Sequence, residues 1–193
     1  MANDTTSKVR DDDVPTEKKL DELYDLIDGI EVAMMTTRAA DGALVSRAMQ
    51  TQARRPGTDL WFMANAESGK IAELRADPHV NLSYYRDRTR EWVSVSGTAV
   101  VTQDRARVHE LYKPSWRAWL GDEGGERDGG PDDPRIALIE VEAHSVTYLK
   151  VNQPRPVRLF QIAKAMVTGD PPKLGSLREL DAGQLATGAG RTK

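Results

Sequence analysis

The chain has 193 residues, of which 39% are hydrophobic and 30% are charged, and its formal net charge is -3. This composition is typical of a globular protein, and it lacks the clustered basic surface that binding to nucleic-acid phosphates requires. The absence of cysteine excludes disulfides, thiolate zinc sites and cysteine nucleophiles. No signal-peptide core and no apolar run of roughly 20 residues occurs, so we expect a cytoplasmic protein with no membrane partner.

The N-terminal region divides into a tail and a helix. Residues 1–14 are polar and acidic, which predicts a disordered tail. An apolar face at helical spacing predicts a helix from Thr16, and this face consists of Leu20, Leu23, Tyr24 and Ile27. Thr16 is the expected helix cap, and Gly29 is expected to end the helix in the left-handed conformation.

From residue 30 the pattern changes to strands separated by turns. Apolar and β-branched runs predict strands over 30–38, 43–52, 59–64, 79–85 and 91–102. Gly97 interrupts the last of these, which predicts a bulge, a bend or a close backbone approach. Short helices are expected over 69–76, ended by Asp77-Pro78, and over 104–112, capped by Asp104.

The C-terminal third begins with a long acidic, glycine-rich loop over 121–134, a kind of segment that is usually functional or disordered. Two strands are predicted over 135–143 and 145–151, and a helix over 157–167. We therefore expect a tail (1–14), one domain (15–155), a helix (156–168) and a mobile tail (169–193). Strands outnumber crossover helices, which favours a mainly antiparallel β fold.

One group of residues indicates a ligand. Ser68 and Lys70 lie at the start of a predicted helix, where free N–H groups and a cation suit a phosphate, and Arg47 on a neighbouring strand could bind the same phosphate. The apolar run 60–63 could support a flat ring. Taken singly, Arg47 fits a surface strand residue and Ser68 fits a simple helix cap. The three histidines lack metal-ligand spacing, so we predict no metal site, and no catalytic residue is assigned.

The same residues carry a family resemblance. SRAMQTQ (46–52), LWFMANAESGKIAEL (60–74), DPHVNLSYY (77–85) and WVSVSGTAVV (92–101) resemble the pyridoxamine-phosphate-oxidase-like split barrels that bind flavin mononucleotide (FMN). WRAWL (116–120) and the segment 129–150 are similar to the bacterial general stress protein branch of that family. The resemblance implies a mainly β protein with short helices, a six-stranded antiparallel split β-barrel, and a homodimer that holds FMN between its protomers.

The resemblance also implies roles for individual residues. The expected phosphate ligands are Arg47, Ser68 and Lys70. The residues expected to line the isoalloxazine ring, largely through backbone groups, are Met49, Gln50, Thr51 and Gln52. The remaining expected cofactor contacts are Phe62, Met63, Trp92 and Trp119, the last from a partner chain or a lid.

The chain departs from the oxidase pattern at three places. Gly69 stands where the oxidase has arginine, Gln52 stands where it has lysine, and its substrate-binding C-terminal segment has no match. Oxidation of pyridoxamine phosphate is therefore not expected. The hypotheses are an FMN-dependent oxidoreductase that uses a small-molecule electron donor or acceptor, a non-catalytic flavin store or sensor, and the same barrel with FAD, a deazaflavin or haem.

Overall fold

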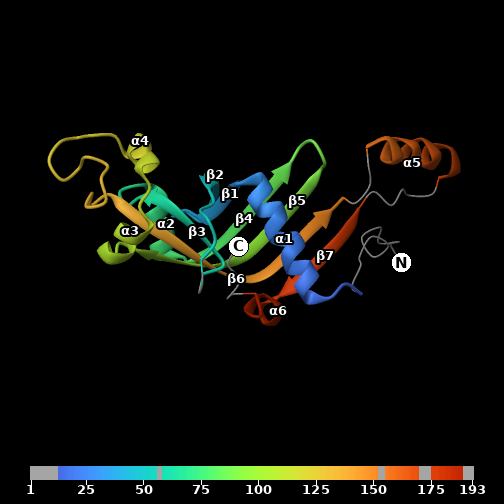
Figure 1. Ribbon diagram of the computed structural model, residues 1–193, viewed down its shortest axis with the longest axis horizontal. Coiled ribbons are helices and arrows are strands. Elements are labelled where there is room, and N and C mark those ends of the chain that lie inside the picture. Colours follow the sequence, from blue (N-terminus) through green and yellow to red (C-terminus); the bar gives the residue numbers. More distant parts are fainter. Residues whose placement is uncertain (1–12, 56–57, 152–154, 170–174, 189–193) are drawn as a thin grey trace.

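The computed structural model describes residues 13–55, 58–151, 155–169 and 175–188 (Figure 1). The expected tail over 1–14 lies almost entirely outside the described residues. In chain order the elements are α1 (Thr16–Ile30), β1 (Val32–Arg38), β2 (Leu44–Gln50), β3 (Leu60–Asn65), α2 (Gly69–Ala76), β4 (His79–Arg86), β5 (Glu91–Thr102), α3 (Arg105–Leu111), the 3-10 helix η1 (Pro114–Trp116), α4 (Arg117–Leu120), β6 (Ile136–Lys150), α5 (Arg155–Thr168), β7 (Ser176–Asp181) and α6 (Ala182–Ala186).

The strands form one antiparallel sheet, which confirms the predicted mainly β fold. Six strands follow the order β2-β1-β4-β5-β6-β3, and β7 pairs with β6 beside this path. The sheet curls, but its two end strands, β2 and β3, are not neighbours in the ladder. A backbone hydrogen bond of 3.0 Å from Gln52 N to Trp61 O bridges them just beyond the end of β2. The barrel is therefore split along the seam between β2 and β3.

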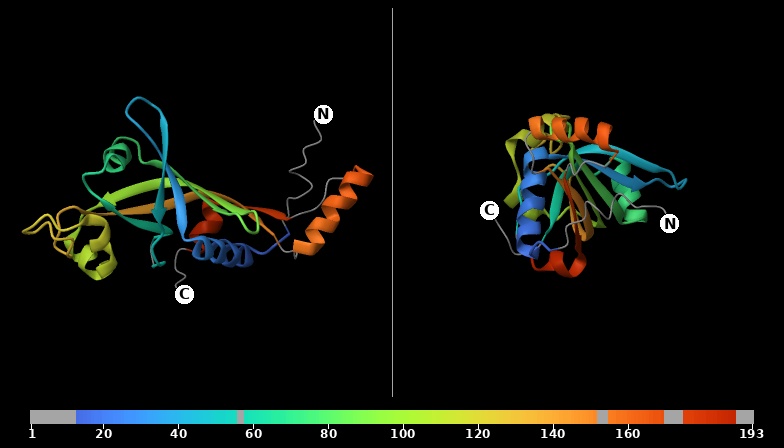
Figure 2. Two further views of the ribbon diagram at one scale, coloured as in Figure 1. Left: turned by 90° about the horizontal axis from the view of Figure 1, so that it is seen from above. Right: turned by 90° about the vertical axis from the view of Figure 1, so that its right-hand side faces the viewer.

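The interior of the curl is filled by a large apolar cluster, and α1 packs along the sheet (Figures 1 and 2). The four residues of the predicted helical face, Leu20, Leu23, Tyr24 and Ile27, are all buried, as expected. A second apolar cluster lies at the end of the molecule that carries α3 and α4, and its buried members are Trp61, Val108, Trp116, Leu120, Ile136 and Leu138. Adjacent residues of β3 therefore face different clusters, because side chains alternate along a strand.

The pairing of β5 with β6 contains the predicted irregularity at Gly97. Ser96 pairs with Ser145 and Gly97 pairs with Ala143, so His144 is an extra residue on β6. The expectation of two strands over 135–143 and 145–151 is wrong, because β6 runs continuously through this bulge from Ile136 to Lys150. The close backbone approach at Gly97 is confirmed, since a Cβ there would overlap the carbonyl oxygen of Glu142.

Two helix ends also test the sequence predictions. Asp104 caps α3 as expected, because its side chain accepts a hydrogen bond of 3.1 Å from Arg107 N. The ends of α1 differ from the prediction. Pro15, not Thr16, occupies the N-cap position, and the helix continues past Gly29 to Ile30. The positive φ that was expected at Gly29 occurs at Glu31, with a value of 67°.

The C-terminal region differs from the expected mobile tail over 169–193. Ser176–Asp181 form β7 on the edge of β6, and Asp181 begins α6 with a capping box that Gln184 completes. Leu177, Leu180 and Leu185 are buried, which gives this segment a place in the packed domain. The helix α5 spans Arg155–Thr168 and stands apart from the sheet at the end opposite α3 and α4 (Figure 1). Among the described residues, no helix is long and apolar enough to cross a membrane.

We expect Gly97→Ala to lower the free energy of unfolding by about 2–3 kcal/mol, because the added methyl group displaces backbone rather than a flexible side chain. Urea denaturation measures this change. The matched control is Gly69→Ala, at the start of α2, where the nearest heavy atom to an added Cβ is 3.9 Å away and no loss is expected. Equal stabilities of the two variants would contradict the close approach.

Candidate functional site

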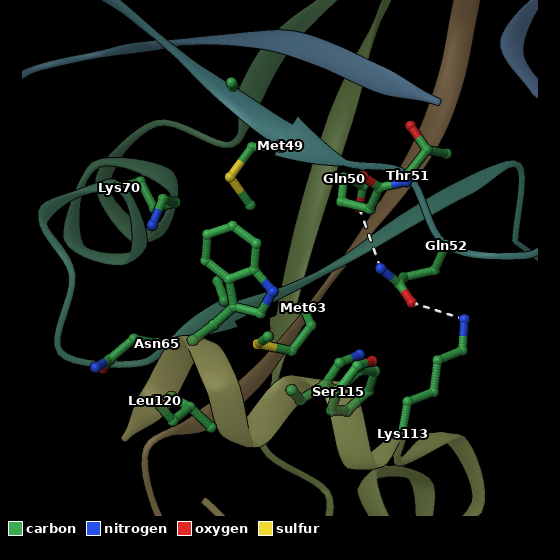
Figure 3. A pocket seen from close by; sticks show the side chains of 14 residues that line it. Met49, Gln50, Thr51, Gln52, Met63, Asn65, Lys70, Lys113, Ser115 and Leu120 are labelled. Carbon is green, nitrogen blue, oxygen red and sulfur yellow. Dashed lines mark hydrogen bonds between the residues drawn. The ribbon is translucent and has the colours of Figure 1, made fainter. Parts of the chain in front are cut away.

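A cavity of about 420 Å³ opens at the seam of the split barrel, within the range of small-molecule sites (Figure 3). One wall is the end of β2 and the residues after it, and a second wall is β3 with the start of α2. The segment from the end of α3 to the end of α4 makes the third wall. The lining residues are Ala48, Met49, Gln50, Thr51, Gln52, Met63, Ala64, Asn65, Lys70, Lys113, Ser115, Trp116, Trp119 and Leu120.

The start of α2 forms the first polar end of the cavity. Ser68 occupies the N-cap position, but its hydroxyl donates to Asn65 O at 2.6 Å and makes no side-chain cap bond. The same hydroxyl accepts a hydrogen bond of 3.0 Å from Lys70 Nζ. Burial and the nearby Arg47 lower the pKa of Lys70 below its ordinary value. A bound anion would relieve both effects, so this end of the cavity suits a phosphate.

Arg47 lies beside this end but does not line the cavity. Its guanidinium forms an ion pair of 2.6 Å with Glu73 and a hydrogen bond with Thr37. Thr37 Oγ1 donates to the same carboxylate oxygen at 2.5 Å. The hydrogen bonds that Glu73 accepts from Thr37 and Arg47 hold the pKa of Glu73 below its ordinary value, although burial acts in the opposite direction. The Glu73 carboxylate is therefore committed to Arg47 and Thr37, and Lys70 has no ion-pair partner among the described residues.

The residues after β2 offer side chains rather than free backbone donors. Thr51 N donates to Glu31 O at 2.9 Å, and Gln52 N donates to Trp61 O. The Gln52 amide turns back along the chain, where its Nε2 donates to Gln50 O at 3.3 Å. Its Oε1 accepts a hydrogen bond of 3.0 Å from Lys113 Nζ on the opposite wall (Figure 3). Residues 49–52 were expected to line a ring largely through backbone groups, and the backbone N–H groups of Thr51 and Gln52 already have acceptors within the chain.

Aromatic packing fixes the third wall. Trp116 is buried and makes edge-to-face contacts with Trp61 at 6.3 Å and with Tyr112 at 5.8 Å between ring centroids. The indole N–H of Trp61 donates to Ala53 O at 2.7 Å. Trp119, one helical turn beyond Trp116, is 82% exposed at the rim of the cavity. An exposed indole at the rim of a cavity provides a surface for a flat ligand or for a partner chain.

A buried ion pair anchors the end of this wall to β6. Arg135 is 1% exposed and Asp133 is 0% exposed, and their closest N–O distance is 2.7 Å. Arg135 also donates to the carbonyl oxygens of Leu120 at 2.8 Å and Gly121 at 2.9 Å. The carbonyl of Leu120 belongs to a residue that lines the cavity. Arg135 therefore holds the start of the 121–134 loop and the end of α4 in one place.

The same loop also contacts the second wall. Arg127 donates to both carboxylate oxygens of Glu67, at 2.7 and 3.0 Å, and Glu67 directly precedes Ser68. Arg127 also pairs with Glu123, and its carbonyl accepts from Arg135. The 121–134 loop, expected to be either functional or disordered, is thus ordered, and its contacts join the second and third walls.

The cavity collects most of the residues that the sequence singled out. Met49, Gln50, Thr51, Gln52, Met63, Lys70 and Trp119 line it. Ser68 contacts Lys70 at its edge. Phe62 is fully buried in the large core cluster, on the opposite face of β3 from Met63. Trp92 pairs with Tyr85 and Leu149 and does not line the cavity.

The cavity residues that were not predicted from the sequence are Ala48, Ala64, Asn65, Lys113, Ser115, Trp116 and Leu120. Asn65 ends a predicted strand directly before the Ser68 loop, so its position carried a usable signal. Lys113 is a single cation after a short helix, and only the folded chain brings it opposite Gln52. The described residues contain no group of acidic and histidine side chains that could hold a metal ion. His144, the extra residue at the β6 bulge, does not line this cavity.

The family model described as pyridoxamine 5'-phosphate oxidase like matches residues 18–173. Protein bli-3 from Neurospora crassa is 38% identical over 173 residues, a span that covers 88% of this chain and 83% of bli-3.

Solved structures share the fold at lower sequence identity. A protein from Jannaschia sp. CCS1, provisionally described as general stress protein 26, has a TM-score of 0.64 and 22% identity and covers 86% of this chain and 99% of its own. A pyridoxamine 5'-phosphate oxidase-related, FMN-binding protein from Nostoc punctiforme has a TM-score of 0.56 and 14% identity, with coverages of 71% and 84%. The split-barrel architecture is therefore shared with these proteins.

We expect Asp133→Asn to lower the free energy of unfolding by about 3 kcal/mol, because it leaves the buried Arg135 guanidinium without its carboxylate. Urea denaturation at pH 7 measures this loss. The control is Asp122→Asn, which removes an ion pair with Arg117 whose side chains are 57% and 55% exposed and should cost less than about 1 kcal/mol. Similar losses in both variants would contradict the anchoring role of the buried pair.

Acid should weaken the same anchor. Hydrogen bonds from Arg135 lower the pKa of Asp133 to about 2 in the folded chain, whereas an unfolded aspartate titrates near ~3.9. This lowered pKa adds stability above about pH 5 that is lost as the pH falls toward 2. Wild type and Asp133→Asn differ in their free energy of unfolding, and part of this difference is linked to the titration of Asp133. That part should be about half as large at pH 3 as at pH 7. A difference that is unchanged between pH 7 and pH 3 in urea titrations would show that this carboxylate does not titrate as described.

Proposed function

The chain belongs to the pyridoxamine 5'-phosphate oxidase-like family, and on that premise we propose that it binds FMN in the seam cavity as a flavin-dependent oxidoreductase of unknown substrate. The observation that carries the proposal is the position of Lys70. This partly desolvated cation lines a ligand-sized cavity and forms no ion pair with a carboxylate among the described residues. A phosphate is the group that would complete this arrangement.

The phosphate end of the proposed site consists of the Ser68 hydroxyl, the Lys70 ammonium and the start of α2. The Ser68 hydroxyl donates its proton to Asn65 O, so it would have to rotate away from that carbonyl to donate to a phosphate, whereas Lys70 contacts only the neutral hydroxyl oxygen. Arg47 acts indirectly in this proposal, because it forms the ion pair with Glu73, and that carboxylate reaches Lys70 only through its charge. Direct binding of the phosphate by Arg47 would require this ion pair to open.

The remaining lining suits a flat, largely apolar ring. Met49 and Met63 extend into the middle of the cavity (Figure 3), and Trp116 and Leu120 close its third wall. Methionine side chains adapt their shape and make favourable contacts with aromatic rings. The lining residues include no histidine, aspartate or glutamate. The flavin itself would therefore carry the electrons, and the chain would bind it, orient it and set its electrostatic surroundings.

The proposal includes a homodimer. Side chains that point away from the barrel interior leave large apolar groups exposed on the sheet: Val32, Met34, Leu44, Tyr85 and Val100. Exposed apolar side chains favour a protein partner, and the proposal takes this partner to be a second copy of the chain. Sedimentation at micromolar concentration tests this part of the proposal, and a monomer at all concentrations would contradict it.

A non-catalytic flavin store or sensor is the second candidate. The absence of histidine, aspartate and glutamate from the cavity lining is as compatible with this candidate as with electron transfer. Anaerobic addition of a nicotinamide donor to the FMN-loaded protein separates the two. Bleaching of the flavin supports the oxidoreductase, and resistance to every donor supports the store. FAD and a deazaflavin remain alternative ligands, to be compared with FMN in the same titrations.

We expect Lys70→Ala to weaken FMN binding about 10- to 100-fold, because a charge-assisted hydrogen bond to phosphate contributes about 1.5–3 kcal/mol. Riboflavin, which has the same ring and no phosphate, should bind both proteins equally. Fluorescence titration measures the affinities, with Lys18→Ala on the exposed face of α1 as a control for the lost charge. Equal FMN affinities of Lys70→Ala and wild type would contradict the proposed phosphate end.

A further inference from the structure

Lys113 is a second cation in the cavity that the proposed phosphate site does not use. It directly precedes η1, and its carbonyl accepts a hydrogen bond of 2.9 Å from Trp116 N. The aromatic packing of Trp116 on Trp61 and Tyr112 therefore fixes the backbone from which the Lys113 side chain projects. The side chain lines the cavity from the wall opposite Gln52.

The charge of Lys113 is not neutralised by the described residues around it. Its hydrogen-bond acceptor is the neutral amide of Gln52, at 3.0 Å, and no carboxylate among the described residues lies within ion-pairing distance. Other cations near the cavity are paired differently: Arg47 with Glu73, Arg127 with Glu67 and Arg135 with Asp133. Lys113 and Lys70 thus stand out as cavity cations without a carboxylate partner in the described part of the chain.

The two lysines lie on opposite sides of the cavity, with Met49 and Met63 between them (Figure 3). A ligand that places its phosphate at Lys70 therefore extends its other end toward Lys113 and Gln52. A flavin ring gains negative charge when it accepts two electrons and one proton from a small-molecule donor, because the second proton is not required to complete the reduction. A cation at that end stabilises the reduced ring more than the oxidised ring.

We propose that Lys113 sets the reduction potential of the bound flavin by stabilising the negative charge of its reduced ring. This inference rests on the proposed function and adds a role to a residue outside the phosphate site. Lys113 is exposed at the cavity mouth, so solvent screens part of its effect on the ring. Gln52 holds the ammonium in position through its Oε1, which makes Gln52 a positioning residue.

The alternative role for Lys113 is purely structural, in which the hydrogen bond to Gln52 only joins two walls of the cavity. The two roles predict different results. A structural role changes the affinities for oxidised and reduced FMN by the same factor, which leaves the potential unchanged. An electrostatic role changes the affinity for the reduced form alone. The midpoint potential then shifts, because the affinities for oxidised and reduced FMN change by different factors.

The test is the midpoint potential of FMN bound to wild type and to Lys113→Gln, measured by anaerobic dithionite titration against a reference dye. We expect Lys113→Gln to bind oxidised FMN within about threefold of wild type and reduced FMN about tenfold more weakly. A tenfold change corresponds to a potential about 30 mV more negative for a two-electron couple. Lys113→Arg, which keeps the charge, should stay near wild type, and the shift should shrink in 1 M salt.

A matched control and three outcomes decide the question. Lys18→Gln removes the same charge from α1 and should leave the potential unchanged. Equal potentials in wild type and Lys113→Gln overturn the inference while leaving FMN binding intact. A shift of the same size in Lys18→Gln also overturns it, because the effect would then be one of net charge. Failure of the wild-type protein to retain FMN overturns the proposed function, and the inference falls with it.

Discussion

The seam between β2 and β3 is the constraint on which the site depends. An antiparallel sheet that curls without closing leaves two end strands whose facing edges must be joined by something other than a ladder. Here the join is the hydrogen bond from Gln52 N to Trp61 O, and the cavity opens beside it. Because β2, β3 and α2 are consecutive in the chain, one short stretch of sequence supplies two of the three walls.

The third wall comes from a distant segment and needs its own anchors. The buried Asp133–Arg135 pair fixes the end of α4 through the carbonyls of Leu120 and Gly121. Burying two charges is costly unless their hydrogen bonds are satisfied, and Arg135 meets this condition with both carboxylate and carbonyl acceptors. The pair therefore specifies one position for the wall more than it adds net stability. Arg47, Arg127 and Arg135, which lie near the cavity, form ion pairs with carboxylates, whereas the two cavity lysines lack carboxylate partners among the described residues.

Much of the fold followed from local patterns. The bounds of α2 and β5, the cap at Asp104 and the close approach at Gly97 were all readable, because each depends on residues near one another in the chain. The bulge at His144 was misread as a break between two strands, since an extra residue interrupts the alternation without ending the strand. β7 was missed because a strand in a segment rich in glycine and charge is stabilised by pairing with β6, which is a long-range contact.

The candidate site was predictable in part for the same reason. Residues 49–52, Met63 and Lys70 come from contiguous elements, and the folded chain places them around one cavity. Phe62 was assigned with its neighbour Met63, although adjacent strand residues face opposite sides. Arg47 was assigned to a phosphate, but its ion pair with Glu73 arises between β2 and α2 only after folding. Lys113 carried no local signal, because its significance comes from Gln52 across the cavity.

The measurement that tests the central claim most directly is the visible absorption spectrum of the purified protein, recorded after addition of FMN and removal of free ligand by desalting. The account predicts retained flavin bands with about one FMN per chain, bound in a cavity whose volume is about 420 Å³. A spectrum without flavin bands after reconstitution would contradict the account and would leave the seam cavity as a site for another ligand.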